Sequence, residues 1–482
     1  MSAQKLNLRA QRVSFAFADR PLLEDVTFHL TRGWTGLVGA NGSGKTTLLR
    51  LLLGELKPTS GHLKLEPDGA RVRWCPQRVE EKDEEIDSFS WASDGLARQL
   101  HGKLRLKIEM LERWPTMSPG ERKRWQLGAA LWSEPEVLLL DEPSNHLDSE
   151  GLALLRGALK EFTGIGVIVS HDRALLDDVT ASTLRLDGGD ARVWHHPFSA
   201  ARELWLEEEQ EQRENQREAK RRLQKEERKL DQARRTLASS ERSLNTGYRM
   251  KNKYDGDART MGADLKAQAA AASHSAKARK LGKQVGQVRE ALEQIEVRDE
   301  AGQALFLRYE PCPHQTVVQL EELQVKREEH VWIRGRNGAG KTTLLRRALA
   351  ECRVPEEKRL VLPQELTEEE TRADLELVRS LPNDERGRVL QLVHALGVEP
   401  EHLLRTEAPS PGEARKLRLA LGLGRHCWIA VLDEPTNHLD LPAIERLEAA
   451  LRDFPGSLLL VTHDEKLGAS VTSRAVTPAS QK

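Results

Sequence analysis

A long internal repeat constrains this chain more than any other feature. GANGSGKTT at Gly39–Thr47 returns as GRNGAGKTT at Gly335–Thr343, 296 residues further on. Three other motifs return at an offset of 292 residues: SPGE, LDEPSNHLD (as LDEPTNHLD) and SHD (as THD). Self-similarity at a fixed spacing indicates a duplicated structure. The 482-residue chain is therefore predicted to contain two copies of one domain.

Both copies contain G-x-x-x-x-G-K-T, which follows a short apolar run and opens into a leucine-rich stretch. Glycines let successive N–H groups surround phosphate oxygens, and the N-terminus of the following helix adds favourable potential. We expect Lys45 and Lys341 to neutralise the β- and γ-phosphates of a nucleotide, and Thr46 and Thr342 to hold Mg²⁺. A plain glycine turn is the alternative for one match, and the second match argues against it.

Each copy also has an apolar run that ends in two acids, VLLLDE and IAVLDE. The first acid, Asp141 or Asp433, is placed to act on Mg²⁺ through water, and the second, Glu142 or Glu434, to polarise an attacking water molecule. A histidine, His171 or His463, follows the glutamate by 29 residues in both copies. A single histidine at a strand end is usually structural, but the identical placement favours a γ-phosphate contact.

The segment between the copies, roughly 201–299, has a different composition. It contains no proline and is rich in strong helix formers. Heptad spacing predicts two long antiparallel helices joined by a tip near Asn245–Asp264, where Gly247, Gly256 and Gly262 interrupt the pattern. The seam residues are Leu223, Leu230, Leu237, Leu244, Leu281, Val285, Val288, Leu292 and Ile295. A charged linker without fixed structure is the alternative.

Taken together, the motifs resemble the nucleotide-binding domains of ABC ATPases. The resemblance implies an α/β fold in which two ABC-type P-loop nucleotide-binding domains, 1–200 and 300–482, are joined by a long α-helical antiparallel coiled-coil linker, 201–299. It further implies Q-loop glutamines at Gln77 and Gln364, D-loop aspartates at Asp148 and Asp440, and head-to-tail pairing. Each P-loop would then face the SPGE signature of the other copy across one ATP.

The motifs and the resemblance assign roles to the following residues. The catalytic set is Glu142, Glu434, His171 and His463. The ATP-binding set is Phe17, Gly39, Ala40, Asn41, Gly42, Ser43, Gly44, Lys45, Thr46, Thr47, Gln77, Ser118, Gly120, Asp148, Gly335, Arg336, Asn337, Gly338, Ala339, Gly340, Lys341, Thr342, Thr343, Gln364, Ser410, Gly412 and Asp440. The Mg²⁺ set, partly through water, is Thr46, Gln77, Asp141, Thr342, Gln364 and Asp433.

Two departures from the family pattern stand out. Pro119 and Pro411 replace a glycine in the signatures, which removes one N–H donor from each site and predicts weakened binding of phosphate rather than a dead site. Phe17 precedes Lys45 by 28 residues, in the place of the aromatic residue that stacks on adenine, whereas Pro313 occupies the equivalent position of the second copy, with Tyr309 nearby. Both copies keep their glutamate, so two hydrolytic sites are expected.

The linker carries a local positive charge. From Arg217 to Arg289 there are 20 lysines and arginines against 8 aspartates and glutamates, although the whole chain has a net charge of -1. A basic hairpin suits insertion among RNA phosphates. The tip offers cations and two aromatic rings for RNA: Arg242, Tyr248, Arg249, Lys251, Lys253, Tyr254 and Arg259. The alternative is that these charges only keep a long hairpin in solution.

Twin domains with a helical linker resemble the ABC-F class. The resemblance implies a Mg-dependent ATPase that binds the ribosome, with its ribosomal RNA and tRNA, and serves translation or antibiotic resistance. Two alternatives stay open: an ATPase that acts on branched DNA, and the energy subunit of a transporter. The apolar runs are far shorter than the roughly 18 residues of a membrane span, and Met1–Ala10 lacks the apolar core of a signal peptide. We therefore expect a cytoplasmic monomer with intramolecular domain pairing and no membrane contact.

Overall fold

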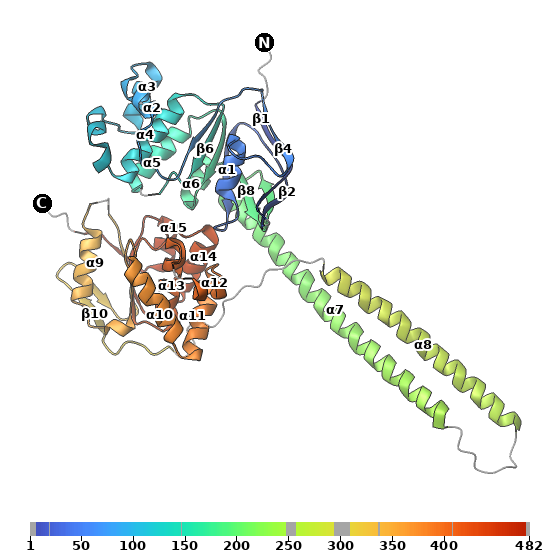
Figure 1. The fold of residues 1–482 in the computed structure, drawn as a ribbon. Helices are drawn as coiled ribbons and strands as arrows, with labels where there is room; N and C mark the ends of the chain where they lie inside the picture. The colour runs from blue at the N-terminus through green and yellow to red at the C-terminus, as the bar shows by residue number, and fades with distance from the viewer. Residues whose placement is uncertain are drawn as a thin grey trace. The chain divides into compact units, whose positions relative to one another are not determined.

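The structure is a computed structural model, and it describes residues 6–18, 20–145, 147–246, 257–293, 309–335, 338–406 and 408–478. The chain divides into two compact units, Met1–Ala201 with Glu300–Lys482, and Arg202–Asp299. The first unit contains both copies of the repeat, and the second contains most of the helical segment between them (Figure 1).

The first copy is built on a six-stranded sheet in the order β5-β6-β7-β3-β8-β9. Every neighbouring pair is parallel except β8 and β9. Its inner strands are continuous apolar runs because both faces of a parallel sheet are covered. The strands are β3 (Gly33–Gly39), β5 (Val72–Cys75), β6 (Val137–Asp141), β7 (Ile165–Val169), β8 (Ser182–Asp187) and β9 (Asp190–Trp194).

A second, antiparallel sheet in the first copy has the order β2-β1-β4. Its strands are β1 (Asn7–Phe17), β2 (Arg20–Leu30) and β4 (Ser60–Glu66). The helices of this copy are α1 (Lys45–Leu53), α2 (Glu84–Trp91), α3 (Gly95–Lys103), the 3-10 helix η1 (Ile108–Thr116), α4 (Pro119–Trp132), α5 (Ser149–Leu159) and α6 (Arg173–Val179). The buried faces of the two sheets share one apolar core with α1.

The second copy repeats the central design with a five-stranded parallel sheet, β13-β14-β15-β12-β16. Its strands are β12 (His330–Ile333), β13 (Arg359–Leu362), β14 (Ile429–Asp433), β15 (Ser457–Val461) and β16 (Arg474–Val476), and β10 (Thr316–Gln319) and β11 (Gln324–Lys326) form a separate hairpin. Its helices are α9 (Lys341–Ala350), η2 (Glu356–Lys358), α10 (Glu368–Ser380), α11 (Asn383–Ala395), α12 (Pro400–Arg405), α13 (Pro411–Gly424), α14 (Leu441–Arg452) and α15 (Glu465–Val471).

The copies differ after the P-loop helix. In the first copy, strand β4 lies between α1 and β5 and completes the antiparallel sheet. In the second copy, only the eight residues 351–358 separate α9 from β13, and among them Cys352 forms an isolated antiparallel bridge with Val318 of β10. The second copy therefore has a single bridge in this connection where the first copy has the full strand β4.

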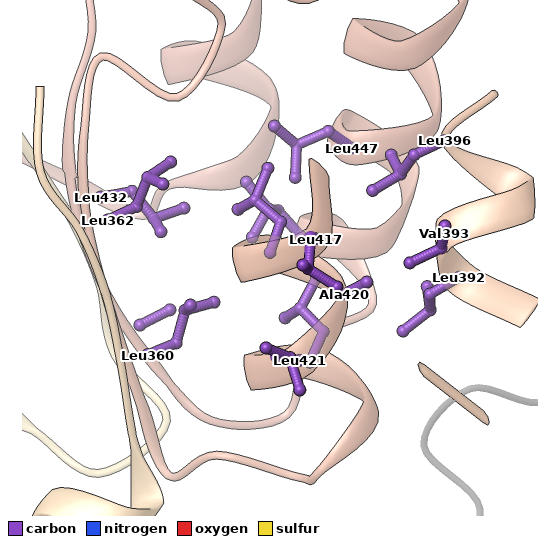
Figure 2. Packing of buried hydrophobic residues seen from close by; sticks show 14 of the residues in the cluster. Leu360, Leu362, Leu392, Val393, Leu396, Leu417, Ala420, Leu421, Leu432 and Leu447 are labelled. Atoms are coloured by element: carbon purple, nitrogen blue, oxygen red, sulfur yellow. The ribbon is translucent and has the colours of Figure 1, made fainter. Parts of the chain in front are cut away.

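The largest described core lies in the second copy (Figure 2). Helix α13 packs Leu417, Ala420 and Leu421 between strand β13 and the neighbouring helices. Gly422 also faces β13, and a Cβ at this position would lie 2.5 Å from the Leu360 side chain. This close approach packs α13, the helix that begins in the second SPGE motif, against β13, the strand that leads to Gln364.

The intervening segment forms two long helices, α7 (Phe198–Thr246) and α8 (Asp257–Glu293). Residues that meet run in opposite senses along the chain: Arg289 Nη2 lies 2.8 Å from Glu227 Oε1, whereas Thr236 and His274 line one shared cavity further toward the tip. The predicted antiparallel hairpin is confirmed (Figure 1). The predicted tip was too wide, because Gly262 lies inside α8.

The described part of the hairpin seam buries few side chains. Leu230 and Val285 are buried, as the heptad spacing predicts, and Ala233 joins them. The side chains of Leu244 and Leu292, and the whole of Ile295, lie outside the described residues. In the described part of the chain, no helix combines the length and apolar character that crossing a bilayer requires.

The core of the second copy provides a stability test. Leu392 of α11 is 3% exposed, whereas Leu390 on the same helix is only partly buried. We expect Leu392→Ala to destabilise this half by roughly 2–5 kcal/mol, because the truncation leaves a cavity. The thermal midpoint measured by calorimetry then falls by several degrees, at roughly 2–4 °C per kcal/mol. Leu390→Ala is the matched control, and an equal fall in both variants would contradict the described packing.

Candidate nucleotide-binding sites

The two P-loops occupy equivalent turns between a central strand and a helix. Strand β3 ends at Gly39, where a Cβ would lie 2.4 Å from the carbonyl oxygen of Leu186. Gly44 precedes α1 with φ of 96°, a left-handed conformation that glycine adopts without strain. Lys45 Nζ donates to the carbonyl oxygens of Gly39 and Ala40 at 2.8 and 2.9 Å, which folds the loop around the ammonium group.

The second P-loop has the same design in its described part. Gly340 precedes α9 with φ of 82°, and Lys341 Nζ donates to Gly335 O at 2.7 Å. Arg336 and Asn337, both predicted to bind ATP, lie outside the described residues. Burial lowers the pKa of Lys45 and of Lys341. An anionic phosphate at either loop would favour the charged lysine.

A threonine and an aspartate meet beside each P-loop. Thr46 Oγ1 donates to Asp141 Oδ2 at 3.0 Å, and Thr342 Oγ1 donates to Asp433 Oδ2 at 2.8 Å. The two oxygens come from α1 and β6 in the first copy, and from α9 and β14 in the second. Hard oxygen donors in such a pair fit Mg²⁺, which takes few protein ligands and completes its shell with phosphate and water.

The glutamate after each aspartate has unusual backbone geometry. Glu142 has φ of 46° and Glu434 has φ of 48°, in the left-handed region that disfavours side chains with a Cβ. Each donates its N–H to the neighbouring strand, Glu142 to Val169 O and Glu434 to Val461 O, both at 2.9 Å. The sharp turn directs a buried carboxylate toward the histidine that follows the next strand.

Each glutamate lies against its switch histidine. His171 Nε2 is 3.1 Å from Glu142 Oε1, and His463 Nε2 is 3.4 Å from Glu434 Oε1. Burial raises the pKa of Glu142 to about 8 and that of Glu434 to about 7. Burial likewise lowers the pKa of His171 to about 3 and that of His463 to about 4, so both imidazoles are neutral at pH 7. In the second copy His463 Nε2 also lies 3.1 Å from Lys341 Nζ, so this histidine lies between the P-loop lysine and the glutamate.

The two signatures cap the helices that follow them. Ser118 and Ser410 each accept the N–H of the glutamate three residues on, and that glutamate accepts a bond in return. Pro119 and Pro411 occupy the first residue of α4 and α13, where a helix needs no N–H and the fixed φ of proline fits. The loss of one donor stays a prediction, and the geometry explains how the proline is accommodated.

The D-loop aspartate of the second copy contacts the first P-loop. Asn41 donates its N–H to Asp440 Oδ2 at 2.7 Å, and Asn41 Nδ2 donates to His438 O at 3.3 Å. Asp440 also caps α14 through the N–H of Ala443. On the other side, Asp148 caps α5 and interacts electrostatically with Lys341. The structure thus brings each D-loop toward the P-loop of the other copy.

Other predicted residues lie nearby without a contact that defines their role. Gln77 and Gln364 are exposed and follow β5 and β13, the strands next to β6 and β14. Phe17 is 53% exposed at the end of β1 and packs edge-on against Phe15. Tyr309 is half-buried beside His426, so the structure turns it toward that ring.

The RNA-binding candidates cannot be placed at side-chain level. Tyr248, Arg249, Lys251, Lys253 and Tyr254 lie outside the described residues. Arg242 and Arg259 belong to α7 and α8, but their side chains are not described.

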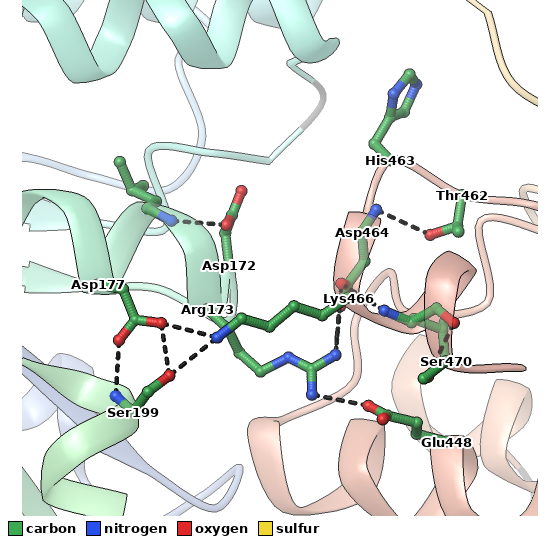
Figure 3. Close-up of polar contacts among 12 residues, drawn as sticks. Asp172, Arg173, Asp177, Ser199, Glu448, Thr462, His463, Asp464, Lys466 and Ser470 are labelled. Atoms are coloured by element: carbon green, nitrogen blue, oxygen red, sulfur yellow. Dashed lines mark hydrogen bonds and ion pairs between the residues drawn. The ribbon is translucent and has the colours of Figure 1, made fainter.

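A polar cluster between the copies escaped the sequence prediction (Figure 3). Arg173, two residues after His171, donates to Glu448 at 2.8 Å and to Asp464 at 3.1 Å. Lys466 of the second copy reaches Asp177 and Ser199 of the first at 2.8 and 2.9 Å. Although burial opposes it, the pKa of Arg173 is raised by Asp464 and Glu448.

No spacing in the sequence singles out this cluster. The residue after the HD pair is Arg173 in the first copy and Glu465 in the second, so the charge at equivalent positions is reversed. Glu465, however, pairs with Arg334 of its own copy at 2.8 Å, whereas Arg173 binds Glu448 and Asp464.

A double-mutant cycle tests this contact. The side chains of Arg173 and Glu448 are only 10% and 15% exposed. We expect Arg173→Met and Glu448→Gln to be non-additive by roughly 1–3 kcal/mol, because the two side chains interact directly in a buried site and each single change weakens the same ion-pair network. The thermal midpoints of the two single variants and the double variant, measured by calorimetry, report the coupling. Arg452, 55% exposed, pairs with the same glutamate within α14, so the Arg452→Met cycle is the control with roughly 0.5 kcal/mol or less.

Comparison with known proteins adds independent information. The ABC transporter family model matches residues 23–145 and 319–437. The tylosin resistance ATP-binding protein TlrC of Streptomyces fradiae is 30% identical, over 95% of this chain and 95% of its own length. The ribosome protection protein VmlR of Bacillus subtilis is 27% identical, over 94% and 83%. The energy-dependent translational throttle protein EttA of Mycobacterium tuberculosis is also 27% identical, over 94% and 88%.

Proposed function

This chain belongs to the ABC transporter family and, within it, to the ABC-F class, and from that premise we propose that it hydrolyses ATP at two composite sites and acts on the ribosome. Domains of this family bind nucleotide, and members of the family hydrolyse ATP. We take 1–200 and 300–482 as the two ATP-binding halves and 201–299 as the linker that engages the ribosome.

One observation carries the proposal of composite sites. The N–H of Asn41 in the first P-loop donates to Asp440 of the other copy, 399 residues away. A phosphate bound at this P-loop would therefore lie next to residues of both copies. Ser410 and Gly412 of the second copy are then expected to complete the first site, and Ser118 and Gly120 of the first copy to complete the second.

The proposed reaction is the hydrolysis of the terminal phosphoanhydride of ATP. An oxygen of water forms a bond to the γ-phosphorus while the bond from that phosphorus to the β–γ bridging oxygen breaks, which leaves ADP and phosphate. Glu142 or Glu434 accepts the proton of the water, and His171 or His463 binds the γ-phosphate. Thr46 with Asp141, and Thr342 with Asp433, would hold Mg²⁺, which when bound neutralises phosphate charge. Lys45 and Lys341 orient the phosphates.

Ribosome action is supported by charge and by relatives. Exposed cations follow both helices of the hairpin, while Leu230 and Val285 are buried in its seam. Such a surface can neutralise RNA phosphates. Two relatives that align with almost the whole chain are named for ribosome protection and for translational throttling. Cytoplasmic location follows from a ribosomal partner.

The two glutamates that end the central strands are the direct test of hydrolysis. We expect Glu142→Gln/Glu434→Gln to keep ATP binding and to lose roughly 100-fold or more of the hydrolysis rate, because amides cannot accept the proton of the water. Phosphate release and equilibrium binding of labelled ATP are the measurements. Glu445→Gln, an exchange of the same kind in α14 outside the site, is the control. Hydrolysis at the parent rate in the double variant would overturn the assigned roles.

The exposed cations of the hairpin are the direct test of ribosome binding. With ATP, the Glu142→Gln/Glu434→Gln protein is expected to sediment with ribosomes on a density gradient. Replacing the exposed Arg228 and Arg235 by glutamine should weaken binding and reduce its dependence on salt by about one unit of log–log slope per lost phosphate contact. Arg372→Gln/Arg405→Gln, two exposed arginines of the second copy, is the matched control. Preference for branched DNA over ribosomes would instead support the DNA-directed alternative.

A further inference from the structure

Two cations are buried at equivalent positions of the signature helices. Lys123 lies in α4 and Arg415 in α13, 292 residues apart, and they are 5% and 2% exposed. Burial of a charge is costly unless hydrogen bonds compensate. Both side chains make hydrogen bonds to the loops that carry the acidic pair and the Q-loop glutamine.

Arg415 uses its guanidinium group on four backbone carbonyls. Nη1 donates to Pro363 O at 3.2 Å and to Gln364 O at 2.7 Å. Nη2 donates to Asp433 O at 3.2 Å and to Glu434 O at 2.6 Å. The planar fork of arginine suits two neighbouring loops at once. Arg415 therefore ties the signature helix to the Q-loop and to the acidic pair.

Lys123 makes a smaller version of the same tie. Its Nζ donates to Pro76 O at 2.5 Å and lies 3.5 Å from Asp141 O. It makes no described bond to the carbonyl of Glu142. The difference follows from shape, because an ammonium group is a point donor and cannot span as many acceptors as a guanidinium fork.

The carbonyl of Glu434 matters because this residue has left-handed backbone. Such a conformation is unfavourable for a residue with a Cβ, and it persists only where surrounding bonds hold it. The N–H of Glu434 is held by Val461, and its carbonyl oxygen is held by Arg415. The carbonyl oxygens of Glu142 and Glu434 each accept the N–H of the asparagine three residues on, at 3.3 and 3.2 Å, and for Glu142 this is the only described bond of that oxygen.

We propose that Arg415 and Lys123 are positioning residues that hold the glutamate and the Q-loop of their own site, and that Arg415 holds Glu434 more firmly than Lys123 holds Glu142. The inference rests on the proposed role of Glu434 in activating water. At the second site, loss of the buried cation should therefore slow the cleavage of bound ATP more than it weakens the binding of ATP. A small displacement of the Glu434 carboxylate is enough, because misplacement of a reacting group by about 1 Å can cost about 100-fold in rate.

The test isolates the second site with Glu142→Gln protein. ATP labelled at the γ-phosphate is bound first, Mg²⁺ is added, and one turnover of cleavage is followed, so reopening of the halves does not limit the rate. We expect Arg415→Met to slow cleavage about 10- to 100-fold while the Kd for ATP changes by less than about threefold. Arg415→Lys should lose about 3- to 10-fold, because lysine reaches fewer carbonyls, and it provides the test if the methionine variant does not fold.

Two controls separate positioning from general stability. Arg418 lies three residues further along α13 and binds Asp374 at 2.5 Å and Val361 O at 3.3 Å, away from Gln364 and Glu434. Arg418→Met is expected to lower the thermal midpoint and to change the cleavage rate by less than about threefold. Arg415→Met in Glu434→Gln protein, where cleavage reports the first site, should also change the rate by less than about threefold.

The outcomes are distinct. Parent-like cleavage in Arg415→Met or Arg415→Lys, a loss in ATP affinity in place of rate, or an equal loss at both sites would overturn the inference. An equal loss in Arg418→Met would also overturn it, because the effect would then be structural. If Glu142→Gln protein binds ATP but cleaves none, the role of Glu434 in hydrolysis fails, and the inference falls with that role.

Discussion

The order of strands in the two central sheets determines which motifs meet at the candidate nucleotide-binding sites. In the first copy β6, β7 and β3 are neighbours, and in the second β14, β15 and β12 are neighbours. Parallel strands end at one edge, so the P-loop, the acidic pair and the histidine meet there although they lie far apart in the chain. The bond between Thr46 and Asp141, and that between Thr342 and Asp433, are direct results of this order.

At that edge, one residue in each copy has a strained backbone conformation. Glu142 and Glu434 have left-handed φ, which turns their carboxylates away from the strand direction and toward His171 and His463. Burial of the same carboxylates raises their pKa to neutral pH or above, which makes each a stronger base when it is ionised. Geometry and acidity therefore share one cause, the enclosure of the end of a central strand.

The two copies are related but unequal, and the inequality is physical. The first copy has strand β4, and the second has an isolated bridge at Cys352 in its place. Arg415 makes four bonds where Lys123 reaches two carbonyls. Arg173 of the first copy binds acids of the second, where the equivalent residue is Glu465. A duplicated domain thus acquired different groups on its two paired surfaces and beneath its two glutamates.

The sequence by itself determined the local chemistry. The P-loops, the strand-terminal acids, the signature caps and the helices of the hairpin all depend on residues within a few turns of one another, so their spacing was sufficient. It also predicted too wide a tip, because a single glycine, Gly262, does not interrupt a helix whose neighbours are strong helix formers.

Only the tertiary structure decided which distant groups meet. The Asn41–Asp440 contact spans 399 residues, and the bonds of Arg173 span 275 and 291. The role of Arg415 likewise depends on how closely α13 packs on β13, which Gly422 permits beside Leu360. No local pattern records such distances, because they are set by the packing of whole helices on sheets and of one copy on the other.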